Sequence, residues 1–339
     1  MSTEAARTHA GASTMLLVME GRRSILDRLY ESISGSLPRC DIFRLDSSQQ
    51  ENLAGFFREN DPSGYERIVI SSRIKRLLGQ ERVLSLIDGL VFFEYDAWQN
   101  YVPEDKYFGQ YSRFYRAIPG CRVVSSGCGV ARRLRTEGID ARFVPKGFDD
   151  GAITDLGRER DILAAFLGST SHQSYTARRK MLETIGQNFP LLVTRTESGA
   201  DYVEMLNRIR IFLSADTGMG EYMLKNFEAM AAGCVLLSQD QGAEENEAVG
   251  FRHMENVVLY QNAEEALEHL ESLRSSPDLC ARLAAAGRRH ATERFSFSRL
   301  GGLIAREISA PMPPLAAPGL LTRLIAMVQY PWLLRPHRQ

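Results

Sequence analysis

The segment from Phe227 to Glu245, FEAMAAGCVLLSQDQGAEE, restricts the fold most, because it joins a short apolar helix to a buried strand through one glycine. Phe227, Met230 and Ala231 recur at helical spacing, and Gly233 ends the helical pattern. The run 234–237 that follows is short and apolar, as in a buried strand. The segment therefore predicts a helix, a tight turn and a parallel strand.

Glu228 is an acidic residue within this otherwise apolar helix. A buried carboxylate is costly unless water or a partner satisfies it. Lys225 precedes it by three residues and lies on the same helix face, one turn away. The two side chains either flank a polar ligand or point to solvent, and their spacing alone leaves both interpretations open.

Four blocks of the second half follow one another in the order of a known family: MLNRIRIFLS (205–214), KNFEAMAAGCVLLS (225–238), ENVVLYQNAEEALEHL (255–270) and ERFSFSRL (293–300). The run 201–297 resembles the carboxyl-terminal half of group 1 (GT4-like) glycosyltransferases, and is most similar to their CgeB-like branch. The resemblance implies the GT-B fold, an α/β architecture of two Rossmann-like domains with parallel sheets that face each other across a cleft.

The resemblance also implies a function in glycan biosynthesis. Such an enzyme transfers a sugar from a nucleoside diphosphate sugar, such as a UDP-sugar, to a glycan, lipid-linked or other hydroxyl acceptor, with retention and without a metal or other cofactor. It implies that Glu228 binds the ribose hydroxyls and that Lys225, part of the CgeB-like pattern, favours the diphosphate. Two alternatives stay open: a nucleotide-sugar isomerase or hydrolase on the same fold, and a non-catalytic nucleotide-binding scaffold protein.

The sequence departs from the broader family at one acidic position. The family motif has two glutamates seven residues apart, but Gly220 occupies the place of the first. Glu221 is one residue later, and one helical step rotates a side chain by about 100°, away from the ligand. The run 217–220 instead offers a glycine-bearing entry to the helix, whose free amides suit a pyrophosphate.

Other donor contacts are expected at the carboxyl ends of the parallel strands, where ligands of such sheets bind. A strand near 161–167 runs into small polar residues, and the basic helix after it carries Arg178 and Arg179. Charges on such a helix are usually solvated, which leaves the role of both arginines open. The predicted donor site comprises Glu228, Lys225, Gly168, Ser169, Thr170, Gly218, Gly220, Glu221, Ser238 and Gln239.

The acceptor is expected in the first domain, whose strands and helices alternate as in a parallel sheet. The loops after its strands nominate Glu20, Gly21, Arg22, Asp96 and Ser126. In FFEYDAW, the carboxylates of Glu94 and Asp96 either act on an acceptor hydroxyl or share a polar strand face without chemistry. The predicted catalytic residues are Lys225, Asp96 and Glu94.

Length and composition fit a two-domain globular protein, with 339 residues, 44% hydrophobic and 24% charged. A net charge of −1 argues against nucleic acid as a partner.

The five cysteines and six histidines form no metal-ligand pattern, so we expect no metal. The scattered cysteines, and first residues that lack an apolar signal core, lead us to expect a reducing, cytoplasmic location. The expected divisions are a flexible N-terminus (1–13), an acceptor domain (14–151), a nucleotide-sugar domain (152–308) and a Pro-rich tail (309–339).

The tail contains GLLTRLIAMVQYPWLLRPHR, which has no acidic residue. Leu321, Leu324, Ile325 and Val328 share one helical face, a composition that suits the surface of an anionic membrane. The same face can pack on this protein or on a second copy of it. Peripheral contact with the inner face of a membrane, packing within the chain and self-association therefore stay open.

Overall fold

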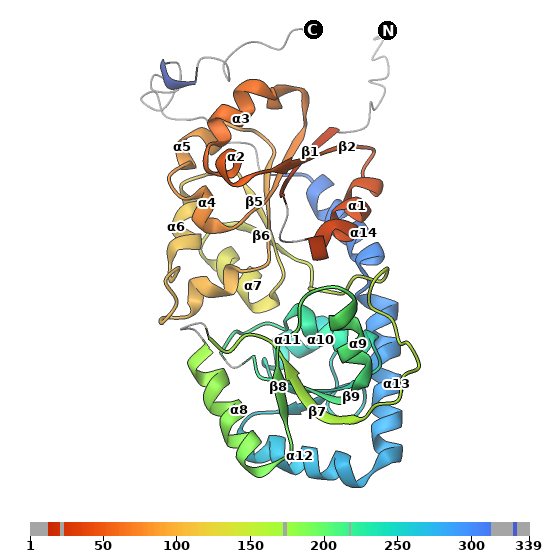
Figure 1. Cartoon of the computed structure of the whole chain (residues 1–339). Coiled ribbons are helices and arrows are strands. Elements are labelled where there is room, and N and C mark those ends of the chain that lie inside the picture. Colours follow the sequence, from red (N-terminus) through yellow and green to blue (C-terminus); the bar gives the residue numbers. More distant parts are fainter. Residues whose placement is uncertain (1–12, 21–23, 172–174, 217, 313–327, 331–339) are drawn as a thin grey trace, which may run out of the picture.

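The computed structural model describes residues 13–20, 24–171, 175–216, 218–312 and 328–330, which form two α/β domains, one above the other in Figure 1. The first contains a six-stranded parallel sheet in the order β2-β1-β3-β4-β5-β6. Its strands are β1 (Ser13–Met19), β2 (Arg39–Leu45), β3 (Arg67–Ser71), β4 (Leu90–Glu94), β5 (Arg122–Ser125) and β6 (Asp140–Phe143). Its helices are α1 (Asp27–Gly35), α2 (Ser47–Glu51), α3 (Leu53–Glu59), α4 (Ile74–Leu77), α5 (Glu81–Leu84), α6 (Gln110–Arg116) and α7 (Cys128–Thr136).

The second domain contains a five-stranded parallel sheet in the order β11-β10-β9-β7-β8. Its strands are β7 (Ile162–Leu167), β8 (Leu192–Thr194), β9 (Ile209–Ser214), β10 (Val235–Gln239) and β11 (Val258–Tyr260). Its helices are α8 (Thr176–Asn188), α9 (Ala200–Arg208), α10 (Leu224–Ala231), α11 (Ala243–Val249), α12 (Ala263–Ser275) and α13 (Pro277–Arg294). The two parallel sheets confirm the predicted α/β class.

The predicted helix, turn and strand are α10, the turn at Gly233 and β10. Gly233 has a φ of 87°, in the left-handed region that glycine adopts without strain. Arg160 donates hydrogen bonds to the carbonyls of Ala232 (2.5 Å) and Ile209 (2.6 Å), so its guanidinium satisfies the end of α10. The positive φ explains why glycine is favoured at position 233, where a Cβ would also lie 2.8 Å from this guanidinium.

Helix α14 (Phe297–Ser309) follows α13 but packs on the first domain (Figure 1). Its apolar residues, such as Leu300 and Ile304, share a core with strand β1 and helix α1. The helices approach so closely that a Cβ at Gly301 would lie 2.2 Å from Ser32 Oγ. The sequence analysis assigned residues 297–308 to the second domain. That assignment was wrong, because the apolar face of α14 is complementary to the first sheet rather than to the second.

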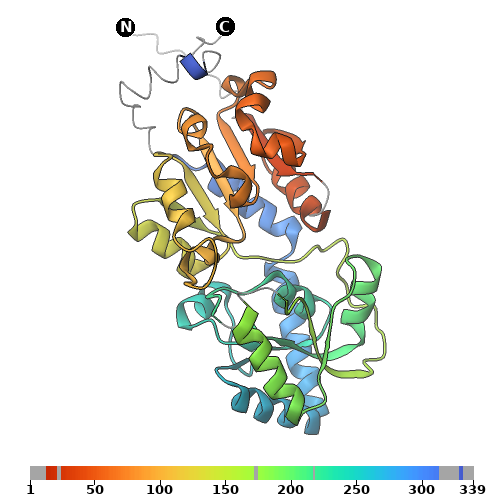
Figure 2. The same cartoon turned by 60° about the vertical axis from the view of Figure 1, so that its left-hand side comes forward.

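Two chain connections cross between the domains (Figures 1 and 2). Backbone hydrogen bonds join these two connections. The Phe148 amide donates to the Phe295 carbonyl (3.0 Å), and the Phe297 amide donates to the Phe148 carbonyl (2.9 Å). A Cβ at Gly147 would lie 2.0 Å from the Phe295 carbonyl oxygen, so only glycine permits this approach. The two connections therefore lie side by side near the predicted linker at Gly151. We call residues 147–148 and 295–297, where they meet, the neck.

Asp150 ties this neck to the first domain. It accepts hydrogen bonds from Arg28 (3.1 Å) and from the Ser298 hydroxyl (2.6 Å). Burial raises the pKa of Asp150, but these hydrogen bonds outweigh it and lower the pKa to about 2. The carboxylate therefore stays ionised and links α1, the linker and the start of α14.

The tail predictions fall mostly on residues 313–327 and 331–339, which lie outside the described residues, as do Gly21, Arg22 and the N-terminal residues 1–12. In the described part of the tail, Tyr330 packs against the core of the first domain. No helix of the described residues has the length and hydropathy needed to cross a bilayer. Membrane contact and self-association stay predictions.

Arg122 on β5 holds the end of α14. Its guanidinium donates to the carbonyls of Glu307 (2.7 Å), Ala310 (2.9 Å) and Pro311 (2.7 Å), and it forms an ion pair with Asp140 (2.7 Å). The last carbonyls of a helix have no partner within the helix. Arg122, which is 0% exposed, supplies that partner from the first sheet.

We predict that Arg122→Met lowers the free energy of unfolding by about 3 kcal/mol, because it removes the buried partner of Asp140 and leaves three carbonyls without their donor. Urea unfolding followed by fluorescence measures the change. The matched control is Arg142→Met, which removes an ion pair to the same Asp140 (3.0 Å) from a side chain that is 46% exposed. We expect the control to cost under about 1 kcal/mol. Equal losses in the two variants would contradict the role of Arg122.

Candidate functional site

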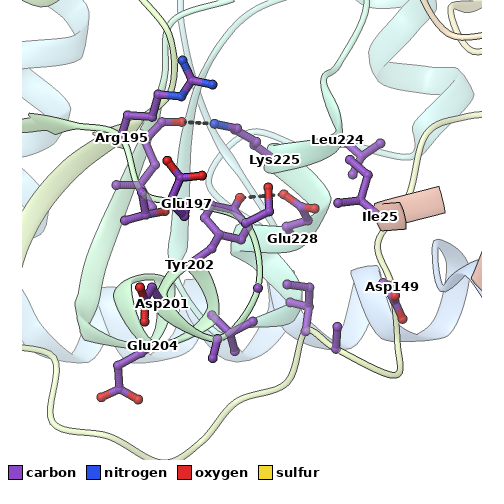
Figure 3. Close-up of a pocket in the computed structure, with 18 of the residues that line it drawn as sticks. Ile25, Asp149, Arg195, Glu197, Asp201, Tyr202, Glu204, Leu224, Lys225 and Glu228 are labelled. Atoms are coloured by element: carbon purple, nitrogen blue, oxygen red, sulfur yellow. Dashed lines mark hydrogen bonds between the residues drawn. The ribbon is translucent and has the colours of Figure 1, made fainter. Parts of the chain in front are cut away.

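A cavity of about 850 Å³ opens beside α10 (Figure 3). Most of its wall comes from the second domain: α10, α9 and the loop after β8. Ile25 of the first domain and Asp149 of the linker complete it. The lining residues are Ile25, Asp149, Ala152, Ile153, Leu156, Leu167, Arg195, Thr196, Glu197, Ser198, Gly199, Ala200, Asp201, Tyr202, Val203, Glu204, Leu224, Lys225 and Glu228.

Glu228 lines this cavity and is buried rather than pointing to bulk solvent. Its carboxylate accepts a hydrogen bond of 2.6 Å from the Tyr202 hydroxyl, which Figure 3 shows as a dashed line. Burial raises the pKa of Glu228, while the Tyr202 hydrogen bond and the charge of Lys225 oppose the rise. Of the two interpretations that the spacing left open, a side chain that points to bulk solvent does not fit the structure, and contact of Glu228 with a ligand stays a prediction.

Lys225 lies at one end of the cavity. Its Nζ donates to the carbonyl of Leu167 at the end of β7 (2.6 Å). Burial lowers the pKa of Lys225, and the charges of Glu228 and Asp216 oppose this. A Cβ at Gly168 would lie 3.3 Å from Nζ, so the glycine leaves room for the ammonium group. The Lys225 ammonium thus lies where the carboxyl end of β7 meets the start of α10.

Arg195, in the loop after β8, lines the same end of the cavity. Figure 3 shows Arg195 and Lys225 together at one end and Asp201 and Glu204 at the other. Arg195 is exposed and forms no salt bridge with a described acid, and its charge also lowers the pKa of Lys225. The cavity therefore has a cationic end and a carboxylate-rich remainder.

A second cavity of about 400 Å³ continues from the first across the cleft. Ile25, Leu167, Arg195, Leu224 and Lys225 line both cavities. The first domain contributes Asp96, Trp98 and Lys146 to the second cavity, and the second domain contributes Gly168, Ser169, Arg178 and Asp216. Three of the predicted donor residues (Lys225, Gly168 and Ser169) and one predicted acceptor residue (Asp96) thus line one cavity, from the second and the first domain respectively.

Arg178 and Arg179 on α8 hold the loop after β7. Arg178 is buried, forms an ion pair with Asp216 (2.6 Å) and donates to the Ser169 carbonyl (3.1 Å). Arg179 donates to the Thr170 carbonyl (2.6 Å). Thr170 lines neither cavity, so this predicted donor contact falls in the supporting loop. The two arginines position the loop through its carbonyls and are not a solvated helix face.

Glu221 and Ser126, predicted to contact donor and acceptor respectively, contact each other instead. Glu221 is buried, forms an ion pair with Lys146 across the domain interface and accepts a hydrogen bond from Ser126 (3.2 Å). Burial raises the pKa of Glu221, and the charge of Lys146 opposes the rise. Gly220, at a φ of 66°, turns the chain so that Glu221 points toward the first domain. Both residues therefore join the domains and line neither cavity.

Glu94, Ser238 and Gln239 also lie away from both cavities. The Glu94 carboxylate accepts hydrogen bonds from the Asp96 amide (2.8 Å) and from the Tyr115 hydroxyl (3.3 Å), both inside the first domain. Ser238 is buried in the second sheet, and Gln239 donates to the Gln261 carbonyl (2.9 Å). Of the two carboxylates in FFEYDAW, Asp96 alone reaches the cleft.

The remaining predicted residues lie at the edge of the site. Gly218 and Gly220 line a third cavity, of about 330 Å³, between α7 and α11, so they do not face Lys225. Glu20 is exposed after β1 and lines none of these cavities. Sequence reasoning did not nominate Tyr202, Arg195, Lys146 or Trp98. The rule that ligands bind after parallel strands would have nominated Arg195, which follows β8 directly.

Glu245 on α11 contacts the other domain at the start of α7. Its carboxylate accepts from the amides of Cys128 (2.8 Å) and Gly129 (3.3 Å). Such amides are free at a helix N-terminus and favour an anion. Burial, with the charge of Glu221, nevertheless raises the pKa of Glu245 to about 7, against these hydrogen bonds. The Glu245 carboxyl, which joins the two domains, therefore titrates near neutral pH.

We predict that this carboxyl makes the protein less stable as the pH rises from about 4.5 to 7. The folded state holds the Glu245 proton up to a pKa of about 7, whereas the ordinary pKa of a glutamate side chain is 4.5. The raised pKa contributes stability that is complete below the lower value and is lost as the pH passes the upper one. Thermal melting between pH 4.5 and 8 measures the slope.

Glu245→Gln should flatten part of that slope because it removes the titrating group. The matched control is Glu244→Gln, at an exposed neighbour that pairs with Arg132 (2.8 Å). The control should keep the wild-type slope. A Glu245→Gln variant with an unchanged slope would show that other groups cause it.

The described residues contain no group of three or more His, Cys, Asp or Glu side chains arranged to hold a metal ion. Metal independence stays a prediction.

Residues 167–300 match a protein-family model described as "Glycosyl transferase-like". The match covers the second domain from the end of β7 to the first turn of α14. No curated protein matches the chain in sequence.

Several solved structures share the fold. The Anabaena protein HepE, in complex with UDP and glucose, is 12% identical, with 88% of this chain and 100% of that chain covered and a TM-score of 0.65. Sucrose-phosphate synthase from Thermosynechococcus elongatus is 13% identical, with 87% and 99% covered and a TM-score of 0.62. T4 phage BGT with its UDP-glucose substrate is 12% identical, with 88% and 100% covered and a TM-score of 0.57. The chain therefore has the GT-B fold, and the CgeB-like branch stays a prediction.

Proposed function

We propose that this protein is a glycosyltransferase that binds a nucleoside diphosphate sugar in the 850 Å³ cavity and transfers the sugar in the adjoining 400 Å³ cavity. The observation that carries the proposal is the position of Lys225, at the junction of the two cavities and one helical turn from Glu228. A family match over the second domain supports the same activity.

The charges of the larger cavity set the orientation of the donor. Lys225 and Arg195 lie together at the cationic end, where a diphosphate would gain charge-assisted hydrogen bonds. Glu228, further along, offers carboxylate oxygens to the ribose hydroxyls, and Tyr202 fixes its orientation. The nucleoside would then occupy the carboxylate-rich part and the sugar would reach the second cavity. UDP is the nucleotide that we propose first, because HepE and T4 phage BGT are in complex with UDP or UDP-glucose.

In the transfer, the bond between the anomeric carbon and the diphosphate oxygen breaks, and a bond from that carbon to the acceptor oxygen forms. Lys225 stabilises the charge that develops on the departing diphosphate. In the retaining reaction, the acceptor attacks from the face that the nucleotide leaves, and its proton passes to the leaving phosphate oxygen. This route needs no resident metal and no protein base.

One observation favours the inverting alternative. Asp96 lines the second cavity from the first domain, opposite Lys225, where a general base would lie. Glu94 does not share this role, because its carboxylate binds inside the first domain. The anomeric configuration of the product, read by NMR, decides between retention and inversion.

We predict that Glu228→Ala weakens the binding of UDP by about ten- to a hundredfold, because it removes a charge-assisted hydrogen bond to the ribose. Calorimetry with UDP measures the affinity, and thermal melting should show a largely intact fold. The control is Glu183→Gln, an exposed carboxylate on α8 that lines neither cavity. Unchanged affinity for UDP in Glu228→Ala would rule out the ribose role.

We predict that Lys225→Ala chiefly lowers turnover, by about a hundredfold, because the lost ammonium group stabilises the departing diphosphate. Release of UDP from saturating UDP-glucose measures the rate, with EDTA and with Mn²⁺ in parallel. The control is Lys180→Ala, an exposed lysine on α8. Equal rates in wild type and Lys225→Ala would remove the leaving-group role. A rate that EDTA abolishes and Mn²⁺ restores would overturn the proposed metal independence.

A further inference from the structure

A further cavity of about 290 Å³ adjoins the cleft on the side of the first domain. It shares Asp96, Trp98, Gln99 and Tyr175 with the second cavity, so the two meet at Asp96. Its far wall carries the basic side chains of Arg73, Lys75 and Lys106. We name it the basic cavity.

Three cations and one carboxylate line the basic cavity, although the whole chain has a net charge of −1. Arg73, Lys75 and Lys106 are exposed, and none of them forms a salt bridge with an acid in the described part of the chain. Other bases of the first domain do have such partners; for example, Arg76 on the same short helix pairs with Glu51. The three cations outnumber the one carboxylate, so the cavity has a net positive charge, which favours the entry of an anion.

Aromatic rings complete the cavity wall. The ammonium group of Lys106 lies 4.7 Å from the centroid of the Tyr107 ring, which fixes it without neutralising its charge. The ring centroids of Tyr107 and Tyr111 are 6.3 Å apart in an edge-to-face arrangement, and Trp98 lines the same cavity. Flat rings of this kind contact the apolar faces of a small cyclic ligand, while the cations take its charged group.

We propose that the basic cavity selects an acceptor whose reacting unit carries a phosphate or a carboxylate. This inference rests on the proposed transferase function, since it treats the hydroxyl at Asp96 as the one that receives the sugar. The anionic group then lies against Arg73, Lys75 and Lys106, and the hydroxyl points across Asp96 toward Lys225. A cavity of about 290 Å³ suits one such unit rather than a polymer segment.

The test uses three probes that share one sugar ring: glucose, glucose 6-phosphate and glucuronic acid. Calorimetry at low ionic strength, with UDP present and without phosphate buffer, measures their binding to the full chain. We expect one or both anionic probes to bind about tenfold or more tightly than glucose, and the stronger of the two identifies the preferred anion. With UDP-glucose as donor, the same order should hold for the acceptor KM.

The test variant is Lys75→Ala/Lys106→Ala, and its control is Arg58→Ala/Lys180→Ala. Each of them removes two positively charged side chains. The control positions are exposed and line neither the basic cavity nor the two cavities of the cleft. The first double variant should lose the preference for anionic probes and keep wild-type affinity for UDP. The control should keep both.

The outcomes separate this inference from the transferase proposal. If UDP binds and sugar is transferred, but glucose binds as well as its anionic analogues or no probe binds, the selection of an anionic acceptor is wrong and the transferase proposal stands. The inference also fails if the Lys75→Ala/Lys106→Ala variant keeps the preference. If UDP neither binds nor is released from UDP-glucose, the transferase proposal fails, whatever the probes show.

Discussion

The structure depends on the close backbone contact at the neck between the two domains. The amide of Phe148 donates a hydrogen bond to the Phe295 carbonyl, and the Phe148 carbonyl accepts one from the Phe297 amide. This close contact leaves no space for a side chain at Gly147. This contact brings the linker and the start of α14 together, so the two sheets meet with the carboxyl ends of their strands facing one cleft. The ends of β4, β7 and β9 supply Asp96, Gly168 and Asp216 to one cavity as a result.

The buried charges near the cleft fall into two groups with different consequences. Glu221 and Lys146 form an ion pair across the domain interface, and Arg178 and Asp216 form another within the second domain. In such a pair, the interaction between the charges offsets part of the cost of removing them from water. Lys225 and Arg195 line the cleft without a salt bridge to a described acid, which leaves their charge to act on a ligand.

The charges that line the cavities also follow an order along the cleft. Carboxylates of Asp201, Glu204 and Glu228 line the larger cavity, and Lys225 and Arg195 line it where it continues into the second cavity. Another set of cations lines the basic cavity. In the proposed reaction, the nucleotide sugar would contact carboxylates and then positive charge, and the acceptor would lie between Asp96 and the cations of the basic cavity. This order follows from the positions of strand ends in both sheets and not from any one motif.

The sequence alone determined what depends on near neighbours in the chain. The spacing of Phe227, Met230 and Gly233 was sufficient for α10 and β10, because helical periodicity and a glycine stop act within a few residues. It also placed Glu228 and Lys225 on one helix face. Only the tertiary structure decided that α14 packs on the first domain, that Glu221 pairs with Lys146, and that Arg73, Lys75 and Lys106 share a cavity. These positions arise from contacts between segments far apart in the chain, where complementary surfaces and charges, rather than local periodicity, determine which residues meet.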